Sequence, residues 1–240
     1  MIKLRPFFSY FGSKWRLAPK YPEPRYDMII EPFAGSAGYS LRYYERQIVL
    51  YDLDPVIAGL WDYLIHVKES EIRGLPSIVN HVDDVDCCQE AKWLIGFIIS
   101  PSQVSPRKNC PPYKYACITR DSWGDVSKNS VADQLQYIRH WRIYNASYRQ
   151  APAHYATWFL DPPYCGASGI HYKYNNVNFQ HLGNWCKNQY GQVIVCESFG
   201  ADWLPFEKFK TPQTGCINSH SLLSEAIWTQ NRDYPGAYDD

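Results

Sequence analysis

Long hydrophobic runs are missing from this chain of 240 residues. No apolar stretch approaches the length of about 20 residues that a membrane-spanning helix requires, and the N-terminal segment lacks the apolar region of a secretory signal peptide. An excess of one charge is also missing, because 24 lysines and arginines balance 24 aspartates and glutamates. These absences predict a cytoplasmic protein without a membrane partner, and the neutral charge argues against a general nucleic-acid-binding protein.

Two kinds of cofactor motif are absent as well. The eight cysteines are scattered and include no Cys-x-x-Cys pair, so we expect no zinc site and no other metal. Reduced thiols are expected in a chain of this size, and a disulfide framework is not. The sequence also lacks Gly-x-Gly-x-x-Gly, which argues against a dinucleotide cofactor.

The charges that are present are unevenly distributed along the chain. Acidic side chains far outnumber basic ones between residues 52 and 90, and the order reverses between residues 92 and 149. A basic segment in a neutral protein is typical of a localised phosphate-contacting surface, although a solvated helical face is the alternative interpretation. The candidate DNA contacts in this segment are Arg107, Lys108, Lys114, Arg120, Arg139 and Arg142.

Residues 158–165 are an apolar run that ends in Asp161-Pro162-Pro163-Tyr164. This pattern predicts a buried strand followed by a stiff turn, because neither proline can donate to a strand ladder. The turn offers a carboxylate, backbone carbonyls and an aromatic ring. Such a set suits a planar amine, whose hydrogens go to the acceptors while the ring stacks on its face. The amino group of a nucleobase is one such amine, and an ordinary turn without a ligand is the alternative.

The N-terminal part reads as the first units of a doubly wound sheet. A strand at residues 28–30 leads through Glu31 and a small-residue loop into a helix that we expect to reach about residue 45. A second strand at residues 48–51 ends at Asp52, and a helix follows at 56–68. Because ligands bind beyond the carboxyl ends of such strands, Asp52 is expected to accept from ribose hydroxyls. Further strands are expected near residues 192–196, 206–209 and 226–229, with a helix at 179–187.

The alternation of strands and helices stops between residues 69 and 150. Apolar residues recur at helical spacing at 91–99 and 131–148, on either side of a basic, proline-rich loop. One helix over 131–148 would gather Tyr137, Trp141, Tyr144 and Tyr148 in a packing stripe and leave the arginines on another face for phosphates. The predicted organisation is therefore a core of residues 1–68 and 151–240 with a helical insertion at 69–150.

Four motifs occur in a telling order: Phe11-Gly12-Ser13-Lys14, Glu31-Pro32-Phe33-Ala34-Gly35, Asp52 and Asp161-Pro162-Pro163-Tyr164. In these motifs the chain resembles the Dam-type DNA adenine-N6 methyltransferases, although Ser13 stands where that family usually has a second glycine. The resemblance implies an α/β fold, a doubly wound Rossmann-like S-adenosylmethionine-dependent methyltransferase core with an inserted helical target-recognition subdomain. It also implies S-adenosyl-L-methionine as cofactor, double-stranded DNA as partner and a monomer or weak dimer. Compactness and neutral charge favour a stand-alone or phage-type enzyme.

Carried over by position, the resemblance implies a cofactor site and a transfer site. The cofactor would lie against Tyr10, Gly12, Lys14, Glu31, Phe33, Ala34, Gly35, Asp52 and Asp161, with Lys14 near its carboxylate and Asp52 on its ribose. The transfer site would be Asp161, Pro162, Pro163 and Tyr164, with Asp161 and Pro162 accepting the amine hydrogens and Tyr164 stacking on an adenine flipped out of the duplex. Alternative acceptors are cytosine N4, RNA and a protein glutamine. A non-catalytic DNA-binding protein that keeps the fold is an alternative of another class.

Overall fold

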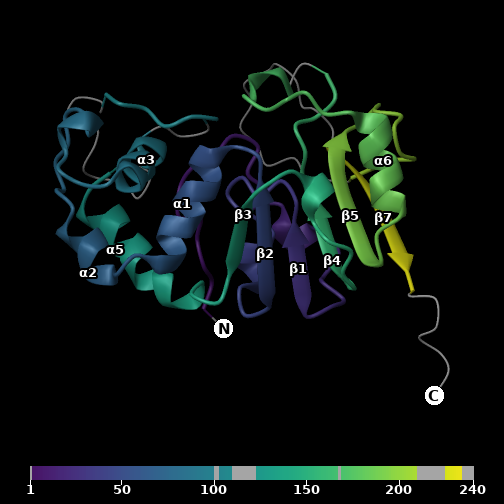
Figure 1. The fold of residues 1–240 in the computed structure, drawn as a ribbon, viewed down its shortest axis with the longest axis horizontal. Coiled ribbons are helices and arrows are strands. Elements are labelled where there is room, and N and C mark those ends of the chain that lie inside the picture. Colours follow the sequence, from purple (N-terminus) through teal and green to yellow (C-terminus); the bar gives the residue numbers. More distant parts are fainter. Residues whose placement is uncertain (1, 100–102, 110–122, 167–168, 210–224, 234–240) are drawn as a thin grey trace.

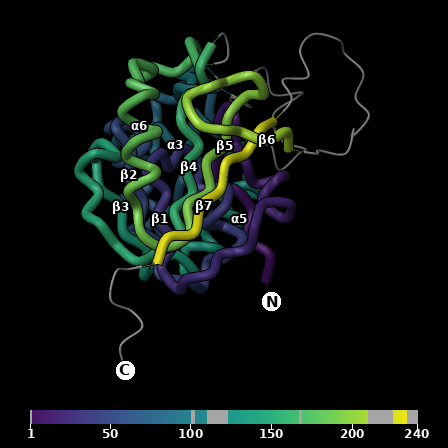
Figure 2. Tube along the Cα trace, turned by 90° about the vertical axis from the view of Figure 1, so that its right-hand side faces the viewer, coloured from purple at the N-terminus to yellow at the C-terminus, as the bar shows by residue number. Residues whose placement is uncertain are grey.

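A seven-stranded, mostly parallel sheet forms the centre of the computed structural model, which describes residues 2–99, 103–109, 123–166, 169–209 and 225–233 (Figure 1). The strand order is β3-β2-β1-β4-β5-β7-β6, and β7 runs antiparallel to both of its neighbours. The strands are β1 (Met28–Glu31), β2 (Gln47–Asp52), β3 (Arg142–Asn145), β4 (Ala156–Leu160), β5 (Gly191–Ser198), β6 (Glu207–Lys208) and β7 (Glu225–Arg232). Figure 2, viewed from the β7 side, shows β7 in yellow alongside β5, with β6 at the edge.

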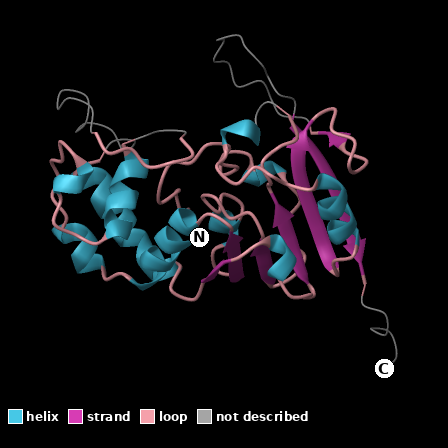
Figure 3. Ribbon diagram, turned by 45° about the horizontal axis from the view of Figure 1, so that its top comes forward, coloured by secondary structure: helices cyan, strands magenta, loops and turns pink. Residues whose placement is uncertain are grey.

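Most helices lie beyond one edge of the sheet, to the left of the strands in Figure 3. The α-helices are α1 (Pro55–His66), α2 (Glu69–Gly74), α3 (Gln89–Ile98), α5 (Asp125–Gln134) and α6 (Phe179–Lys187). Short 3₁₀ helices are η1 (Ala18–Lys20), η2 (Ser40–Tyr43), η3 (Val82–Asp84), η4 (Leu135–Tyr137), η5 (Tyr148–Gln150) and η6 (Gly169–His171). Among the helices in the described ranges, none has the length and apolar character needed to span a membrane.

The strand order reverses at β1, as the sequence predicts for a doubly wound sheet. Ile30 of β1 pairs with Val49 of β2 on one side and with Trp158 of β4 on the other. The chain thus runs outward from β1 to β2 and β3 and then returns to β4. In sheets of this kind the crevice beyond the carboxyl ends of the two central strands is the usual ligand site. The prediction of an α/β fold with a mostly parallel sheet is therefore confirmed, and the strand order is compatible with a doubly wound, Rossmann-like arrangement.

Both faces of the sheet are covered, which explains why the strands are apolar without alternation. All residues of β4 and β5 are buried. Ile29, Phe159 and Ile194 face a core that includes α1, α3 and the N-terminal aromatics Phe7 and Phe8. The neighbouring strand residues, including Ile30, Trp158 and Val193, face a second core built with α6.

Two helix predictions are wrong. Residues 131–148 do not form one helix: α5 ends at Gln134, and β3 then pairs in parallel with β2 at the edge of the sheet. Trp141 fixes this change of direction, because its indole N–H donates to the carbonyl of Tyr44 at 3.2 Å and its side chain is buried. The predicted aromatic stripe therefore does not exist. The helix expected up to residue 45 is only the 3₁₀ helix η2.

The segment predicted as an insertion contributes both helices and a strand. Helices α2, α3 and α5 lie beyond α1, on the far side of β3 from the rest of the sheet (Figure 1). Within this group α2 packs against α5, and α3 packs against α1. The segment returns to the sheet with β3, so its C-terminal part belongs to the core architecture.

Arg139 has a structural partner that the sequence does not reveal. Its guanidinium donates to the carbonyls of Leu64, Ile65 and Val67 at the C-terminal end of α1. The last carbonyls of a helix lack partners within the helix, and a cation there also complements the helix dipole. The structure thus gives Arg139 the role of a helix cap instead of the predicted phosphate contact.

We predict that Arg139→Ala lowers the free energy of unfolding by about 1 kcal/mol, because the end of α1 loses charge-assisted hydrogen bonds. Arg142→Ala is the matched control, since this exposed arginine lies on the edge strand β3, and its effect should stay within about 0.5 kcal/mol. Urea unfolding measures both values. An unchanged stability of Arg139→Ala together with weakened DNA binding would restore the phosphate-contact interpretation.

Candidate functional site

Five chain segments deliver acidic side chains to one edge of the sheet. Glu31 ends β1, Asp52 ends β2 and Asp161 follows β4, so all three lie at carboxyl ends of parallel strands. Glu197 lies near the end of β5. Glu225 begins the antiparallel β7 opposite Ser198, so its position is at the same edge. The topology alone thus concentrates acidic side chains beside the carboxyl ends of β1 and β4, where the strand order reverses.

A cavity of about 620 Å³ opens at this edge. Every residue that the resemblance assigns to the cofactor lines it: Tyr10, Gly12, Lys14, Glu31, Phe33, Ala34, Gly35, Asp52 and Asp161. Sequence analysis missed several further lining residues, which come from the segment after β3 and from the loop before α6: Ser147, Tyr148, Arg149, Tyr172, Lys173, Asn176 and Asn178. We refer to this space as the first cavity.

Asp52 ties the loops of the first cavity together. Its Oδ2 accepts from the amide N–H of Gly35 at 3.0 Å, and its Oδ1 accepts from the amide N–H of Asp54 at 2.9 Å. Burial raises the pKa of Asp52 to about 6, although these two hydrogen bonds act to lower it. Asp54 instead caps α1 by accepting from the amide N–H of Val56. Asp52 remains the acid with spare acceptor capacity toward the cavity.

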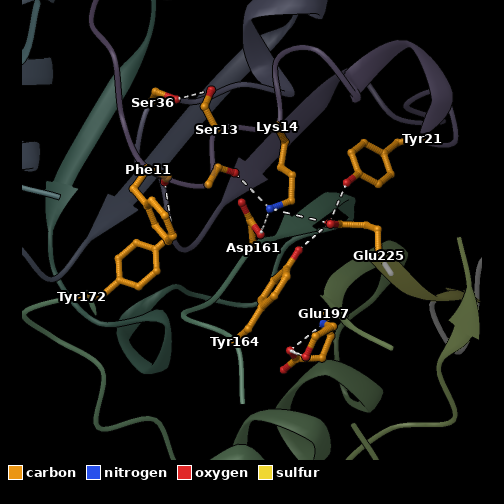
Figure 4. A network of polar contacts seen from close by, with 12 residues as sticks. Phe11, Ser13, Lys14, Tyr21, Ser36, Asp161, Tyr164, Tyr172, Glu197 and Glu225 are labelled. Carbon is orange, nitrogen blue, oxygen red and sulfur yellow. Dashed lines mark hydrogen bonds and ion pairs between the residues drawn. The ribbon is translucent and has the colours of Figure 1, made fainter. Parts of the chain in front are cut away.

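Two glycines allow close approaches of the N-terminal loop, one to the β1 loop and one to the segment between β4 and α6. Gly35 has a φ of 45°, and a side chain there would meet the ring of Tyr10 at 3.1 Å. Gly12 has a φ of 74°, and a side chain there would lie 2.5 Å from the Tyr172 hydroxyl. The N-terminal loop and the β1 loop are joined directly where the hydroxyl of Ser36 donates to the hydroxyl of Ser13 at 2.8 Å (Figure 4). Ser13 thus accepts a hydrogen bond between the two loops that a glycine at this position could not accept through a side chain.

Lys14 is buried at the centre of a charged cluster (Figure 4). Its Nζ lies 2.8 Å from Asp161 Oδ1, 3.6 Å from Glu225 Oε1 and 3.0 Å from the carbonyl oxygen of Gly12. Burial acts to lower the pKa of Lys14, but Asp161 and Glu225 outweigh it and raise the pKa above its ordinary value. Asp161 and the carbonyl of Gly12 are within hydrogen-bond distance of the ammonium, and Glu225 adds a second ion pair. The structure therefore directs Lys14 to protein carboxylates, where sequence analysis expected a ligand carboxylate.

Asp161 carries the other charge of this pair. Burial raises its pKa to about 6, while Lys14 acts to lower it and Glu225 acts to raise it. With both acids ionised, Lys14, Asp161 and Glu225 together carry a net negative charge. Asp161 thus titrates near the lower end of the neutral range and can accept a proton or a hydrogen bond there.

Tyr164 faces this cluster. Its ring centroid lies 4.7 Å from Lys14 Nζ, and its hydroxyl donates to Glu225. The side chain lines a second cavity of about 770 Å³ and does not line the first. Pro163 lines the first cavity. Pro162, which lies between Asp161 and Pro163 in the chain, is buried.

The two cavities share one wall that includes Asp161. Six further residues line both of them: Tyr10, Phe11, Gly12, Ser13, Lys14 and Tyr172. The second cavity is bordered further by the N-terminal segment, by α3 and α5, and by the start of β7; its other lining residues include Arg5, Ile98, Ser127, Ser130, Val131 and Glu225. The motif residues thus separate two spaces instead of surrounding one.

Glu197 anchors the turn that follows Tyr164 and was also missed by the sequence analysis. This fully buried carboxylate accepts from the amide N–H of Cys165 at 3.0 Å, from the amide N–H of Ser198 at 2.7 Å and from the indole N–H of Trp203 at 3.0 Å. These bonds fix the end of the Asp-Pro-Pro-Tyr turn against β5. An acid next to a wholly apolar strand is the sequence signal that could have indicated such a role.

The candidate DNA contacts do not gather at the cavities. Lys114 and Arg120 lie outside the described residues. Of the other four, none lines either cavity. Lys108 pairs with Asp83 at 2.8 Å, and Arg107 and Arg142 are exposed. In the described part of the chain, no group of three His, Cys, Asp or Glu side chains could hold a metal ion.

Glu31 provides a pH-dependent test of the cavity floor. It is 2 % exposed and accepts from the amide N–H of Ser40 at 2.7 Å. Burial raises the pKa of Glu31 from 4.5 to about 8, although the contacts with Ser40 act to lower it. The native state therefore binds a proton more tightly than the unfolded state, and stability is lost as the pH rises through this interval.

We predict that Glu31→Gln is more stable than the wild type at pH 8.5 or above, and that this advantage shrinks as the pH falls toward 4.5, the ordinary pKa of the group. The comparison with the wild type isolates Glu31 from Asp52 and Asp161, whose pKa values are also raised. Thermal unfolding across this pH range measures the difference. Glu207→Gln, a change to an exposed acid on β6, serves as the control. A pH-independent difference would contradict the burial argument.

A comparison with models of known protein families finds no match for this chain, and a comparison with curated protein sequences finds none either. The chemistry of the site therefore has to be inferred from its own residues. One feature is Asp161, which lines both cavities. The others are Lys14, which is buried and paired with two acids, and Asp52, which accepts from Gly35 and has acceptor capacity for hydroxyl groups.

Proposed function

We propose that this protein transfers a methyl group from S-adenosylmethionine to the N6 amino group of an adenine in double-stranded DNA. The observation that carries the proposal is that Asp161 lines both cavities. A transfer reaction needs one group that touches the acceptor while the donor lies beside it. Asp161, at the start of a turn rich in amine acceptors, meets that need.

The first cavity fits S-adenosylmethionine in size and in chemistry. Its volume of about 620 Å³ suits a ligand of this size. Asp52 offers acceptors for ribose hydroxyls, and the rings of Phe33 and Tyr148, 5.5 Å apart, offer flat apolar surface for a purine. The acids at this edge suit the positive charge of a sulfonium group. Because Lys14 is occupied, Arg149 and Lys173 are the lining cations that remain for a ligand carboxylate.

The bound cofactor would supply an electrophilic methyl group, and the chain's own residues would prepare the acceptor. An aromatic amine is a poor nucleophile, because its lone pair is delocalised into the ring. Asp161 and the carbonyl of Pro162 would accept its hydrogens and favour a more tetrahedral nitrogen. As the bond between nitrogen and the methyl group formed and the sulfur–methyl bond broke, with S-adenosylhomocysteine as the leaving group, positive charge would develop on the nitrogen, and the negative charge of Asp161 would stabilise it. The nitrogen would then lose a proton, and Asp161 would be its acceptor.

The second cavity would receive the flipped adenine. Tyr164 lines it, and one face of its ring is directed at Lys14, so the base would stack on the other face. Residues of α3 and α5 also line this cavity. That position supports a target-recognition role for the helices between residues 69 and 137, because they border the space where the base would enter.

Methyl transfer from labelled S-adenosylmethionine to unmethylated DNA, followed by digestion to nucleosides, tests the proposal. We expect N6-methyladenine from the wild type. In the Asp161→Asn variant we expect turnover to fall by at least about 100-fold, because the charge opposite the developing cation is lost, while cofactor binding stays measurable. Asp62→Asn, on the exposed face of α1, is the control.

Other outcomes identify the alternatives. N4-methylcytosine, or label in RNA or protein, would replace adenine by another amine acceptor. Tight DNA binding without methyl transfer would indicate a non-catalytic protein. Full activity of Asp161→Asn would contradict the role of Asp161.

A further inference from the structure

Glu225 is a buried acid that no sequence motif identifies. It is the first residue of β7 and pairs with Ser198 at the end of β5. Since β7 runs antiparallel to β5, its first residue reaches the edge where the parallel strands end. The side chain is only 13 % exposed and lines the second cavity together with Tyr164.

One oxygen of Glu225 gathers three donors from separate parts of the chain (Figure 4). Its Oε1 accepts from the hydroxyl of Tyr164 and from the hydroxyl of Tyr21 at 3.1 Å, and lies 3.6 Å from Lys14 Nζ. Tyr164 belongs to the turn after β4, and Lys14 and Tyr21 belong to the N-terminal segment. Glu225 therefore connects the base-stacking residue of the proposed site to the lysine that holds Asp161.

We propose that Glu225 is a positioning residue for methyl transfer, which holds the Tyr164 ring in the second cavity and Lys14 against Asp161. This inference rests on the proposed function and adds a residue to it. Without the Glu225 contact, the Tyr164 hydroxyl would lose one of its acceptors, and Lys14 would have one carboxylate partner fewer. Both changes would reduce the fraction of molecules in which acceptor and donor are aligned.

Glu225 also sets the charge of the cluster. Lys14 and Asp161 alone would cancel, whereas the additional carboxylate leaves a net negative charge beside the nitrogen that becomes positive. In the described part of the chain, the groups that face this point from the surrounding elements are Lys14, Asp161, Tyr164, Tyr21, Tyr172 and Cys196. Among the residues of the described chain that shift Asp161, Lys14 lowers its pKa and Glu225 raises it. Removing the charge of Glu225 should therefore lower the pKa of Asp161.

Glu225→Gln tests the proposal, because the amide oxygen can still accept from both tyrosines while the charge is lost. We expect kcat to fall by about tenfold or more, with the cofactor dissociation constant within about twofold. We also expect the acid limb of the pH profile of kcat to move to lower pH, because Glu225 acts to raise the pKa of Asp161. Loss of packing alone would not move this limb. Glu207→Gln on the neighbouring strand β6 is the matched control and should leave kcat and the profile unchanged.

Tyr164→Phe separates the two parts of the role and covers the case in which Glu225→Gln fails to fold. It removes the hydroxyl that donates to Glu225 but keeps the ring and every charge. We expect a lower kcat and an acid limb that moves to higher pH, opposite in direction to the shift in Glu225→Gln, because the Tyr164 hydroxyl acts to lower the pKa of Asp161. An active wild type with unchanged kcat and pH profile in Glu225→Gln, or unchanged kcat in Tyr164→Phe, would overturn the role of Glu225. A wild type that transfers no methyl group would instead refute the proposed function.

Discussion

The buried ammonium of Lys14 is the interaction on which the arrangement of the site depends. A charge removed from water costs several kcal/mol unless it is paired and hydrogen-bonded, and Lys14 finds its partners on β7 and directly after β4. These contacts hold the N-terminal loop over the carboxyl ends of the strands. This placement of the loop puts Gly12 against Tyr172 and Ser13 against Ser36. It also separates the space at this edge into two cavities that share one wall, which includes Asp161.

The sheet supplies what this lysine needs and imposes a cost of its own. Parallel strands end together, so Glu31, Asp52 and Asp161 are buried close to one another, and burial raises the pKa of each. Such an accumulation of acids lowers stability at neutral pH. It also creates a region of negative potential in which a cationic ligand, or a cation that develops during a reaction, is stabilised. The same acids thus account for the loss of stability at neutral pH and for the chemistry proposed for the site.

The local pattern of apolar, polar and turn residues in the sequence predicted a large part of this structure. Strands β1, β2, β4 and β5 and helices α1 and α6 were found because each is a short apolar run or an amphipathic period bounded by turn residues. The four motifs likewise located one wall of both cavities. Apolar spacing could not distinguish the edge strand β3 from a continued helix, because its structure depends on pairing with β2 far away in the sequence. Glu225 escaped for the same reason, since only the register of β7 against β5 brings it to Lys14.

A crystal structure of the complex with S-adenosylhomocysteine tests the central claim most directly. The account predicts the ribose against Asp52 in the first cavity, with Lys14 Nζ still within about 3 Å of Asp161 and the ligand carboxylate bound elsewhere. A complex in which Lys14 leaves Asp161 and Glu225 to bind the ligand carboxylate would contradict it, as would a ligand bound outside the first cavity.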